Sequence, residues 1–220
     1  MITIDGPAGA GKSTTARLLA KRLGYRYLET GAMYRAMAWK VARVSVEPGA
    51  PQEFERVVRS TRIEITASGR LVTDGEDITE AIRSPEVDRL ASRLSALPVV
   101  REVLTRLQQE AVKEGGVVLE GRDTGSVVAP EAEVKFYLDA SLEERARRRL
   151  RDLAARGRKA EIARVTAEMA ERDRADSSRA LAPLVRPRDA RYVDSSALSP
   201  DEVVELMLRE VERVRCSTGS

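Results

Sequence analysis

The sequence predicts an α/β fold in which helices flank a mainly parallel sheet. Short apolar segments alternate with longer amphipathic segments along most of the chain, and this alternation is typical of βαβ units. Residues 62–82 instead alternate apolar and polar side chains between turn signals, which indicates a small antiparallel meander inserted into the α/β chain. From residue 142 onward a long stretch is rich in Arg and helical in pattern. The prediction is therefore one α/β domain with two added pieces.

The strands and helices are predicted from the period of their apolar residues. Five short apolar runs are expected to form the strands of the sheet, at 1–5, 25–29, 117–120, 134–138 and 192–194. Apolar residues recur every three or four positions in the helical segments, at 12–23, 31–46, 99–114, 142–156, 161–173 and 200–215. In the meander, Ser68-Gly69 and Asp74-Gly75 are the expected turns.

The composition excludes several kinds of catalytic chemistry. The 220 residues include one Cys and no His, which rules out an intrachain disulfide, the usual zinc sites and Ser-His triads. The chemistry must then use carboxylates, Arg, Lys, hydroxyl groups or a hard cation. Of the 38 basic residues all but six are Arg, and the planar guanidinium is a good ligand for phosphate and carboxylate groups.

Residues 6–13, GPAGAGKS, match the pattern G-x-x-x-x-G-K-[ST] between a predicted strand and a predicted helix. The glycines let backbone N–H groups turn toward phosphate oxygens, and the following helix adds its positive dipole end. In such a P-loop, Lys12 contacts the β- and γ-phosphates and the Ser13 hydroxyl binds Mg²⁺. The motif predicts a P-loop NTPase fold, a three-layer α/β/α arrangement. Its expected nucleotide-binding residues are Gly6, Pro7, Ala8, Gly9, Ala10, Gly11, Lys12, Ser13 and Thr14.

Two carboxylates lie at the ends of predicted strands near this motif. Glu120 ends the strand at 117–120, and Asp5 directly precedes the P-loop. Either carboxylate is placed to help hold Mg²⁺, but either can equally pair with a neighbouring Arg. The sequence leaves both interpretations open for both residues.

A P-loop alone indicates nucleotide binding and does not specify a reaction. The chain lacks the N-K-x-D motif by which switch GTPases read guanine, and it is shorter than most motor ATPases. A small chain with an Arg-rich helical segment favours a kinase of a small acceptor, because phosphoryl transfer is catalysed mainly by positioning and by positive charge. No general base is required when the acceptor is itself a phosphate.

Four stretches together resemble the bacterial cytidylate kinases, a family of nucleoside monophosphate kinases. They are ITIDGPAGAGKST (2–14), ETGAMYR (29–35), EGRDTGSVV (120–128) and RDRADSSRALAPL (172–184). The meander resembles the enlarged nucleotide-binding insertion of that family, and the resemblance extends to about residue 213. The last two stretches are specific to this family, whereas the P-loop is not. The resemblance implies transfer of the γ-phosphoryl group of MgATP to CMP or dCMP, giving ADP and CDP or dCDP, in pyrimidine nucleotide metabolism.

The resemblance also implies which residues bind the acceptor. Ser92, Arg101 and Asp123 match residues that read the cytosine edge, and a carboxylate that accepts from the N4 amino group is a reasonable physical code. Tyr34 would hold the nucleotide. The implied catalytic residues are Lys12, Arg35, Arg122, Arg172 and Arg179. The implied substrate-binding residues are Thr30, Tyr34, Arg35, Ser92, Arg101, Gly121, Arg122, Asp123, Arg172, Asp176 and Arg179.

Within this set, the phosphate and sugar of the acceptor have separate partners. Arg35 and Arg122 would contact its phosphate, while Arg172, Asp176 and Arg179 match residues around its ribose and phosphate. Departures from the family pattern are mild, such as Thr30 where the family often has Ser, and none removes a required charge. Ordinary structural roles remain open for three of these residues: an exposed Arg at a helix start for Arg101, a turn for Asp123 and core packing for Tyr34.

The Arg-rich helix at 142–156 is expected to act as part of a lid over ATP. Its arginines point in several directions on a helix, so most are expected to be solvated or paired with nearby carboxylates. One or two should reach the ATP phosphates. The arginines are Arg145, Arg147, Arg148, Arg149 and Arg151, and the carboxylates are Glu143, Glu144 and Asp152.

The resulting domain prediction is a single kinase domain over 1–220. Its core is expected at about 1–35, 100–140 and 180–215, its nucleotide-binding insertion at about 36–99 and its lid at about 141–179. No apolar run approaches a membrane span and no signal peptide is recognisable, so a cytoplasmic monomer is expected.

ATP and CMP or dCMP are the expected partners, with no nucleic acid and no membrane. The rival interpretations are a P-loop kinase for another small acceptor and an RNA-binding or regulatory P-loop protein. A net charge of only +3 and the absence of aromatic stacking surfaces count against the RNA-binding protein.

Overall fold

The computed structural model describes residues 1–66, 69–155 and 157–218, and the chain divides into two compact units. Unit 1 consists of Met1–Leu28 and Glu114–Ser220, and unit 2 consists of Glu29–Lys113. Two predictions involve residues outside the described part: the turn at Ser68 and the end of the Arg-rich helix at Arg156. Among the described residues, no helix is long and apolar enough to cross a bilayer.

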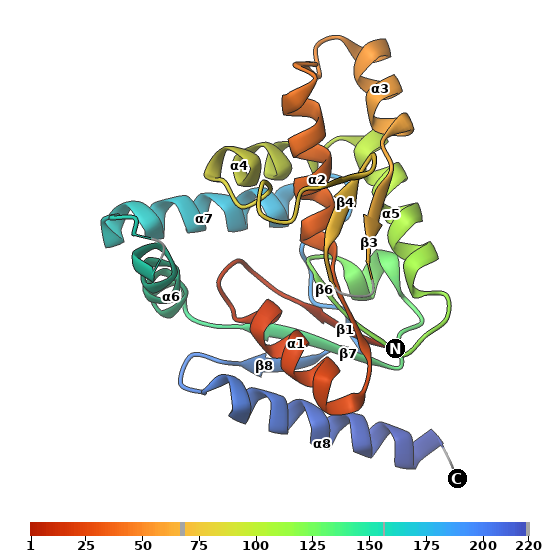
Figure 1. The fold of residues 1–220 in the computed structure, drawn as a ribbon. Helices are drawn as coiled ribbons and strands as arrows, with labels where there is room; N and C mark the ends of the chain where they lie inside the picture. Colours follow the sequence, from red (N-terminus) through yellow and green to blue (C-terminus); the bar gives the residue numbers. More distant parts are fainter. Residues whose placement is uncertain (67–68, 156, 219–220) are drawn as a thin grey trace. The chain divides into compact units, whose positions relative to one another are not determined.

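A five-stranded sheet forms the centre of unit 1, in the order β2-β6-β1-β7-β8 (Figure 1). Its strands are β1 (Ile2–Asp5), β2 (Arg26–Glu29), β6 (Val117–Gly121), β7 (Val134–Asp139) and β8 (Arg191–Asp194). The pairings of β1 with β6, β1 with β7, and β7 with β8 are parallel. Because β1 is central, the loops after β1, β6 and β7 leave the same edge of the sheet, where ligands of open α/β sheets bind.

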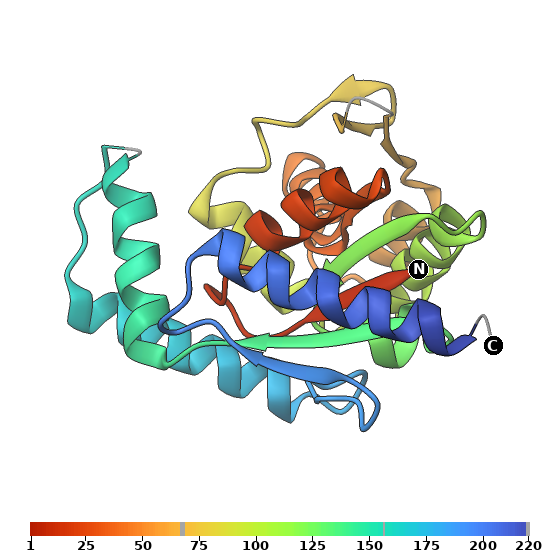
Figure 2. The same cartoon turned by 90° about the horizontal axis from the view of Figure 1, so that it is seen from below.

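Two helices of unit 1 pack against each other and against this sheet: α1 (Lys12–Leu23) and α8 (Pro200–Thr218). Figure 2 shows α8 running beside α1. Their contact with the strands is apolar, because Leu19 of α1 and Met207 of α8 are fully buried in one cluster with Ile4 and Phe136. This arrangement fixes the start of α1, and with it the P-loop.

The Arg-rich segment forms two helices, α6 (Leu142–Ala155) and α7 (Ile162–Ser178), which pack on each other through Ala146 and Met169. The sequence predicted the second helix to end near residue 173, but it continues to Ser178. Arg172 and Asp176 therefore lie on α7, and Arg179 is the first residue after it, in an extended conformation. A short π-helical turn, η1 (Thr124–Val128), follows β6.

Unit 2 contains the predicted meander and more helix than was predicted. The meander consists of β3 (Ile63–Ile65), β4 (Leu71–Thr73) and β5 (Glu76–Asp77), in antiparallel pairs. Asp74 and Gly75 both have positive φ, which confirms the tight turn expected there. The helices are α2 (Thr30–Arg43), α3 (Pro51–Ser60), α4 (Pro85–Leu94) and α5 (Pro98–Val112). Of these, α3 and α4 were not predicted, although each begins with Pro, a frequent first residue of helices.

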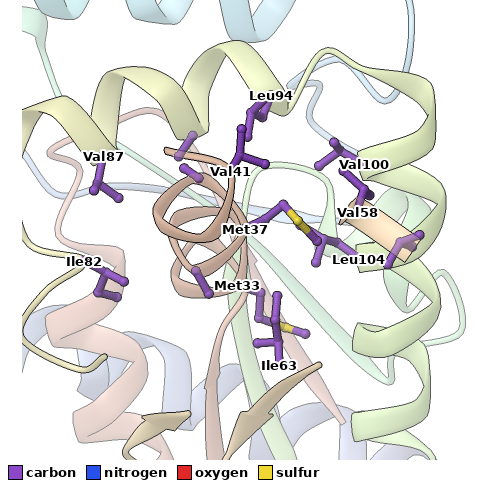
Figure 3. Packing of buried hydrophobic residues seen from close by; sticks show 14 of the residues in the cluster. Met33, Met37, Val41, Val58, Ile63, Ile82, Val87, Leu94, Val100 and Leu104 are labelled. Atoms are coloured by element: carbon purple, nitrogen blue, oxygen red, sulfur yellow. The ribbon is translucent and has the colours of Figure 1, made fainter. Parts of the chain in front are cut away.

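The core of unit 2 is a single apolar cluster around α2, shown in Figure 3. Met33, Met37 and Val41 lie on one face of that helix and are almost fully buried. They pack with side chains from the surrounding helices and strands, including Leu94 and Leu104. The two units together confirm the predicted class: a mainly parallel central sheet with flanking helices, plus a small antiparallel sheet.

Candidate active site

The P-loop of unit 1 links β1 to α1 as the sequence predicted. A side chain at Gly6 would place its Cβ 1.9 Å from the carbonyl oxygen of Leu138 in β7, so only Gly fits against that neighbouring strand. Gly11 precedes α1 with a φ of 94°, a left-handed conformation that Gly adopts without strain. The two glycines let the loop turn tightly over the sheet edge and enter the helix.

Lys12, the first residue of α1, lies buried above this loop. Its ammonium group donates a 2.7 Å hydrogen bond to the carbonyl oxygen of Pro7. Burial, with a further contribution from the positive charges of Arg122 and Arg172, lowers the pKa of Lys12 to about 7, although the negative charge of Glu120 opposes the shift. So low a pKa means that the surroundings of Lys12 carry too little negative charge to stabilise its charged form. A bound polyphosphate would supply that charge.

Asp5 anchors the loop that follows β6. Its Oδ1 accepts hydrogen bonds from the backbone N–H and the hydroxyl of Thr124 (2.9 and 2.8 Å), and its Oδ2 accepts from the N–H of Gly125 (2.7 Å). Burial raises the pKa of Asp5 in spite of these bonds. The sequence offered a metal ligand or an ion pair with Arg for this carboxylate. In the structure both oxygens of the carboxylate bind η1, so that Asp5 ties this turn to the end of β1.

Glu120, the other candidate carboxylate, is buried at the end of β6. Its Oε1 accepts a 2.7 Å hydrogen bond from the hydroxyl of Tyr27 in β2. Glu120 also lies close enough to Lys12 to favour the charged form of the lysine. Tyr27 was not predicted as a site residue, because only the pairing of β2 with β6 brings its ring to this carboxylate.

Charged side chains from the turn between β6 and η1 and from the C-terminal end of α7 form one cluster in unit 1. Arg122 donates from Nε to Oδ2 of Asp176 at 2.8 Å. The guanidinium of Arg179 lies 3.5 Å from Oδ1 of Asp123 and 3.8 Å from Oδ1 of Asp176. Burial alone would raise the pKa of Asp176, but Arg122, Arg172 and Arg179 outweigh it and lower that pKa. The structure thus brings together five of the predicted acceptor residues.

This cluster adjoins the P-loop. Arg122 and Arg172 are close enough to Lys12 to shift its pKa, so three cations from three separate parts of the chain meet at one edge of the sheet. The turn proposed for Asp123 as an alternative is also present in part, because its backbone carbonyl oxygen accepts a hydrogen bond from the N–H of Val127 in η1. Its buried carboxylate nevertheless faces Arg179.

Four of the five arginines of α6 fall into two pairs with different roles. Arg147 and Arg151 are exposed and pair with Glu143 and Glu144, as expected for most of them. Arg145 and Arg148 instead reach the P-loop, where they donate to its backbone carbonyl groups. The sequence predicted that one or two arginines would reach phosphates. It gave no reason to expect that two would hold the loop itself.

Unit 2 carries the remaining predicted residues on its helices. Arg101 of α5 lies over the ring of Tyr34 of α2, 5.8 Å from the ring centroid, and donates from Nη1 to the carbonyl oxygen of Ser95 at 3.1 Å. Arg101 is buried, so its interpretation as an exposed helix-start residue is wrong. Arg35 forms an ion pair with Glu29. Thr30 begins α2, and Ser92 lies on α4, which packs against α2.

Comparison with known proteins shows which family this chain belongs to. The family model described as cytidylate kinase matches residues 2–213. A cytidylate kinase of Pelotomaculum thermopropionicum is 48% identical over 218 residues, covering 97% of this chain and 96% of that protein. One of Geobacter sulfurreducens is 45% identical over 224 residues, covering 100% of this chain and 96% of that protein.

Among solved structures, an uncharacterised protein of Eubacterium ventriosum shares the fold, with a TM-score of 0.53 and 10% identity. The match covers 96% of this chain and 97% of that one. At that identity the match supports only a shared fold. The family model and the two relatives match nearly the whole sequence and support membership of a family. The chain belongs to the cytidylate kinase family.

Proposed function

We propose that this protein transfers the γ-phosphoryl group of ATP to CMP or dCMP, giving ADP and CDP or dCDP. The observation that carries the proposal is the family match over residues 2–213. The site supports it, because the P-loop lysine, Arg122 after β6 and Arg172 of α7 meet at one edge of the sheet. Such a cluster of cations suits a reaction in which negative charge spreads over the transferred phosphoryl oxygens.

On the donor side, the P-loop N–H groups and Lys12 hold the β- and γ-phosphates. The ammonium group of Lys12 donates to the carbonyl oxygen of Pro7. When ATP binds, the group donates to phosphate oxygens in place of this neutral partner. Because burial keeps the group from water, its attraction for the polyphosphate is stronger than it would be at the surface. Arg122 and Arg172 add positive charge on the side where the acceptor phosphate enters.

On the acceptor side, an oxygen of the CMP phosphate attacks the γ-phosphorus as the bond to the ADP oxygen breaks. No proton has to leave the attacking oxygen, so no general base is needed. The protein contributes mainly by positioning the two phosphates. We assign Arg35, Arg122, Arg172 and Arg179 to phosphate and sugar contacts. Asp176 holds two of these guanidinium groups in place.

The residues present also suit Mg²⁺, which lowers the negative charge of the ATP phosphates when it is bound. Mg²⁺ prefers oxygen ligands and commonly takes one or two from the protein, with phosphate oxygens and water supplying the rest. The Ser13 hydroxyl, at the start of α1, and the Glu120 carboxylate, at the end of β6, are oxygen ligands of this kind. Asp5 is less suited, because both of its oxygens already accept hydrogen bonds from the η1 turn.

Cytosine recognition is assigned to Ser92, Arg101 and Asp123. A carboxylate accepts a hydrogen bond from the exocyclic amino group of cytosine, whereas it repels the carbonyl oxygen that uracil carries at the same position. The stacking of Arg101 on Tyr34 and its bond to the carbonyl of Ser95 hold the guanidinium in one orientation. Held in this way, the planar group can donate to the O2 and N3 side of a base.

A coupled assay of ADP release tests this assignment with CMP, dCMP, UMP, AMP, GMP and TMP as acceptors. We expect CMP and dCMP to be phosphorylated with the highest kcat/KM. Preferred turnover of AMP or TMP would contradict the cytosine assignment while leaving a nucleotide kinase intact. We further propose that the enzyme works as a cytoplasmic monomer that needs neither nucleic acid nor a membrane; light scattering of the purified protein tests the monomer.

A further inference from the structure

Two backbone carbonyl groups of the P-loop accept hydrogen bonds from side chains outside the motif. The carbonyl oxygen of Ala8 accepts from Nη1 of Arg145 at 3.1 Å. That of Ala10 accepts from the hydroxyl of Ser195 at 3.0 Å and from Nη1 of Arg148 at 3.3 Å. Arg145 and Arg148 come from α6, and Ser195 directly follows β8. Two segments far from the P-loop in the sequence therefore hold its backbone in place through these carbonyl groups.

Ser195 is the most constrained of these donors. It is 3% exposed, and its hydroxyl lies 2.9 Å from the carbonyl oxygen of Asp139 as well as 3.0 Å from that of Ala10. A hydroxyl has one proton to donate. The backbone N–H of Ser195 already donates to the carbonyl oxygen of Asp139, at 2.8 Å. The other donor to Ala10, Nη1 of Arg148, is longer at 3.3 Å, so Ala10 is the carbonyl that more needs the hydroxyl proton, and we assign the proton to it. The hydroxyl oxygen accepts in turn from Arg148 at 3.0 Å.

Arg148 is fixed from the other side. Its Nη2 donates to the carbonyl oxygen of Ser195 at 2.6 Å, and its Nε donates to Oε1 of Glu144 at 3.1 Å. The planar guanidinium thus bonds three separate elements at once, the P-loop, the turn after β8 and its own helix. A Lys at this position could keep the charge but not this fork of donors.

The hydrogen bond to Ala10 has a consequence on the inner side of the loop. In a trans peptide the carbonyl group and the N–H group of the next residue point in opposite directions, and no peptide bond among the described residues is cis. Holding the carbonyl of Ala10 outward therefore turns the N–H of Gly11 inward, toward the space where a P-loop holds phosphate. Gly11 has a φ of 94°, a region from which Gly can readily depart when such a restraint is lost.

We propose that Ser195, together with Arg148, is a positioning residue for the donor nucleotide: the pair holds the P-loop backbone so that the Gly11 N–H is ready for an ATP phosphate oxygen. Neither side chain needs to touch ATP for this effect. The inference rests on the proposed role of ATP as the phosphoryl donor. It adds residues outside the P-loop motif to those that prepare the site for ATP.

The test is Ser195→Ala, with Ser196→Ala as the matched control. Ser196 is the next residue of the same turn, and its hydroxyl bonds Asp194 and the N–H of Ser141 rather than the P-loop. Losing one buried hydrogen bond corresponds to a change of about 3- to 10-fold. We expect the KM for ATP to rise by that factor in Ser195→Ala, with the KM for CMP and the melting temperature nearly unchanged. Ser196→Ala should leave both KM values unchanged.

Two further measurements keep the outcomes distinct. Calorimetric Kd values for MgATP report on Ser195 even if CMP proves not to be the acceptor, so the proposed function and this inference can fail separately. The amide resonance of Gly11 should shift in Ser195→Ala and in Arg148→Lys but not in Ser196→Ala. Equal rises in the two KM values, an unchanged Kd for MgATP, or equal effects of the two serine variants would each overturn the proposal.

Discussion

The two compact units hold their functional side chains by different means. In unit 1 the site residues depend on buried polar contacts, such as the carboxylate of Asp5 under η1 and the hydroxyl of Ser195 behind the P-loop. In unit 2 they project from helices that pack through one apolar cluster around Met37. Loss of a polar contact in unit 1 should therefore change mainly the kinetic constants of the enzyme, whereas loss of packing in unit 2 should change mainly the stability of the fold.

The largest expected effect in unit 1 follows from Lys12→Ala. Removing the cation that meets the β- and γ-phosphates should lower kcat/KM by at least about 1,000-fold, because phosphoryl transfer depends on charge stabilisation in a buried site. The assay is ADP release at saturating CMP.

Stability provides the control for Lys12→Ala. Because the pKa of Lys12 is lowered, its charged form is less favourable in the folded protein than in the unfolded chain. Thermal unfolding of Lys12→Ala should therefore show a melting temperature equal to or above that of the wild type. A clear drop in melting temperature would mean that Lys12 supports the fold of unit 1, and the comparison of the two units would then fail.

The corresponding change in unit 2 is Met37→Ala. Met37 is fully buried in the cluster, so its truncation should lower the free energy of unfolding by about 2–5 kcal/mol. Urea titration measures the loss, and the remaining folded protein should keep a kcat within about 2-fold of the wild type, because no polar contact changes. Val44→Ala, at the exposed end of α2, is the control and should change stability by less than about 0.5 kcal/mol.

A smaller effect on rate is expected from Asp176→Asn. Asp176 accepts from Arg122 and lies beside Arg179, and a neutral amide would hold both guanidinium groups less firmly. We expect kcat/KM for CMP and dCMP to fall by about 10- to 100-fold, since hydrogen bonds between charged groups contribute more than neutral ones. The exposed Glu171 on the same helix supplies the control, Glu171→Gln. Wild-type kinetics with both acceptors in Asp176→Asn would remove this residue from the site.

The smallest effect concerns pH. Burial, Arg122 and Arg172 lower the pKa of Lys12 to about 7 in the ligand-free protein, against the opposing charges of Glu120 and Asp5. Bound phosphates favour the charged lysine, so ATP binding at pH 8 should take up close to one proton. The affinity for ATP should then weaken by about 5-fold between pH 7 and pH 8. Calorimetry in two buffers of different ionisation enthalpy measures the uptake; none at pH 8 would show that Lys12 is already charged.

The P-loop could be predicted fully from the sequence, because its function depends on residues that are adjacent in the chain. The parallel sheet and the meander were predictable for a similar reason, since the periods of their side chains are local patterns. The helices α3 and α4 were missed although their signals are local too: a Pro at the first position of each, and Ser84 as a cap that accepts from the N–H of Val87.

The supporting residues of the site could not be predicted, because their partners are distant in sequence. Tyr27 reaches Glu120 only when β2 lies beside β6. Ser195 lies 185 residues after Ala10 and reads as an ordinary turn residue after a short strand. Arg145 was one of several arginines on its helix. Only packing reveals that its side chain is buried and donates to the carbonyl oxygen of Ala8 and to the carboxylate of Asp173.

The most direct test of the central claim, that the acceptor is a cytosine nucleotide, is the ratio of kcat/KM for CMP to that for UMP in the wild type and in Asp123→Ala. The loss of the ion pair with Arg179 affects both acceptors and cancels in the ratio. We predict a ratio of at least about 10 in the wild type and a fall of about 10-fold or more in Asp123→Ala, because only cytosine donates to this carboxylate. Equal losses for CMP and UMP, with an unchanged ratio, would contradict the account.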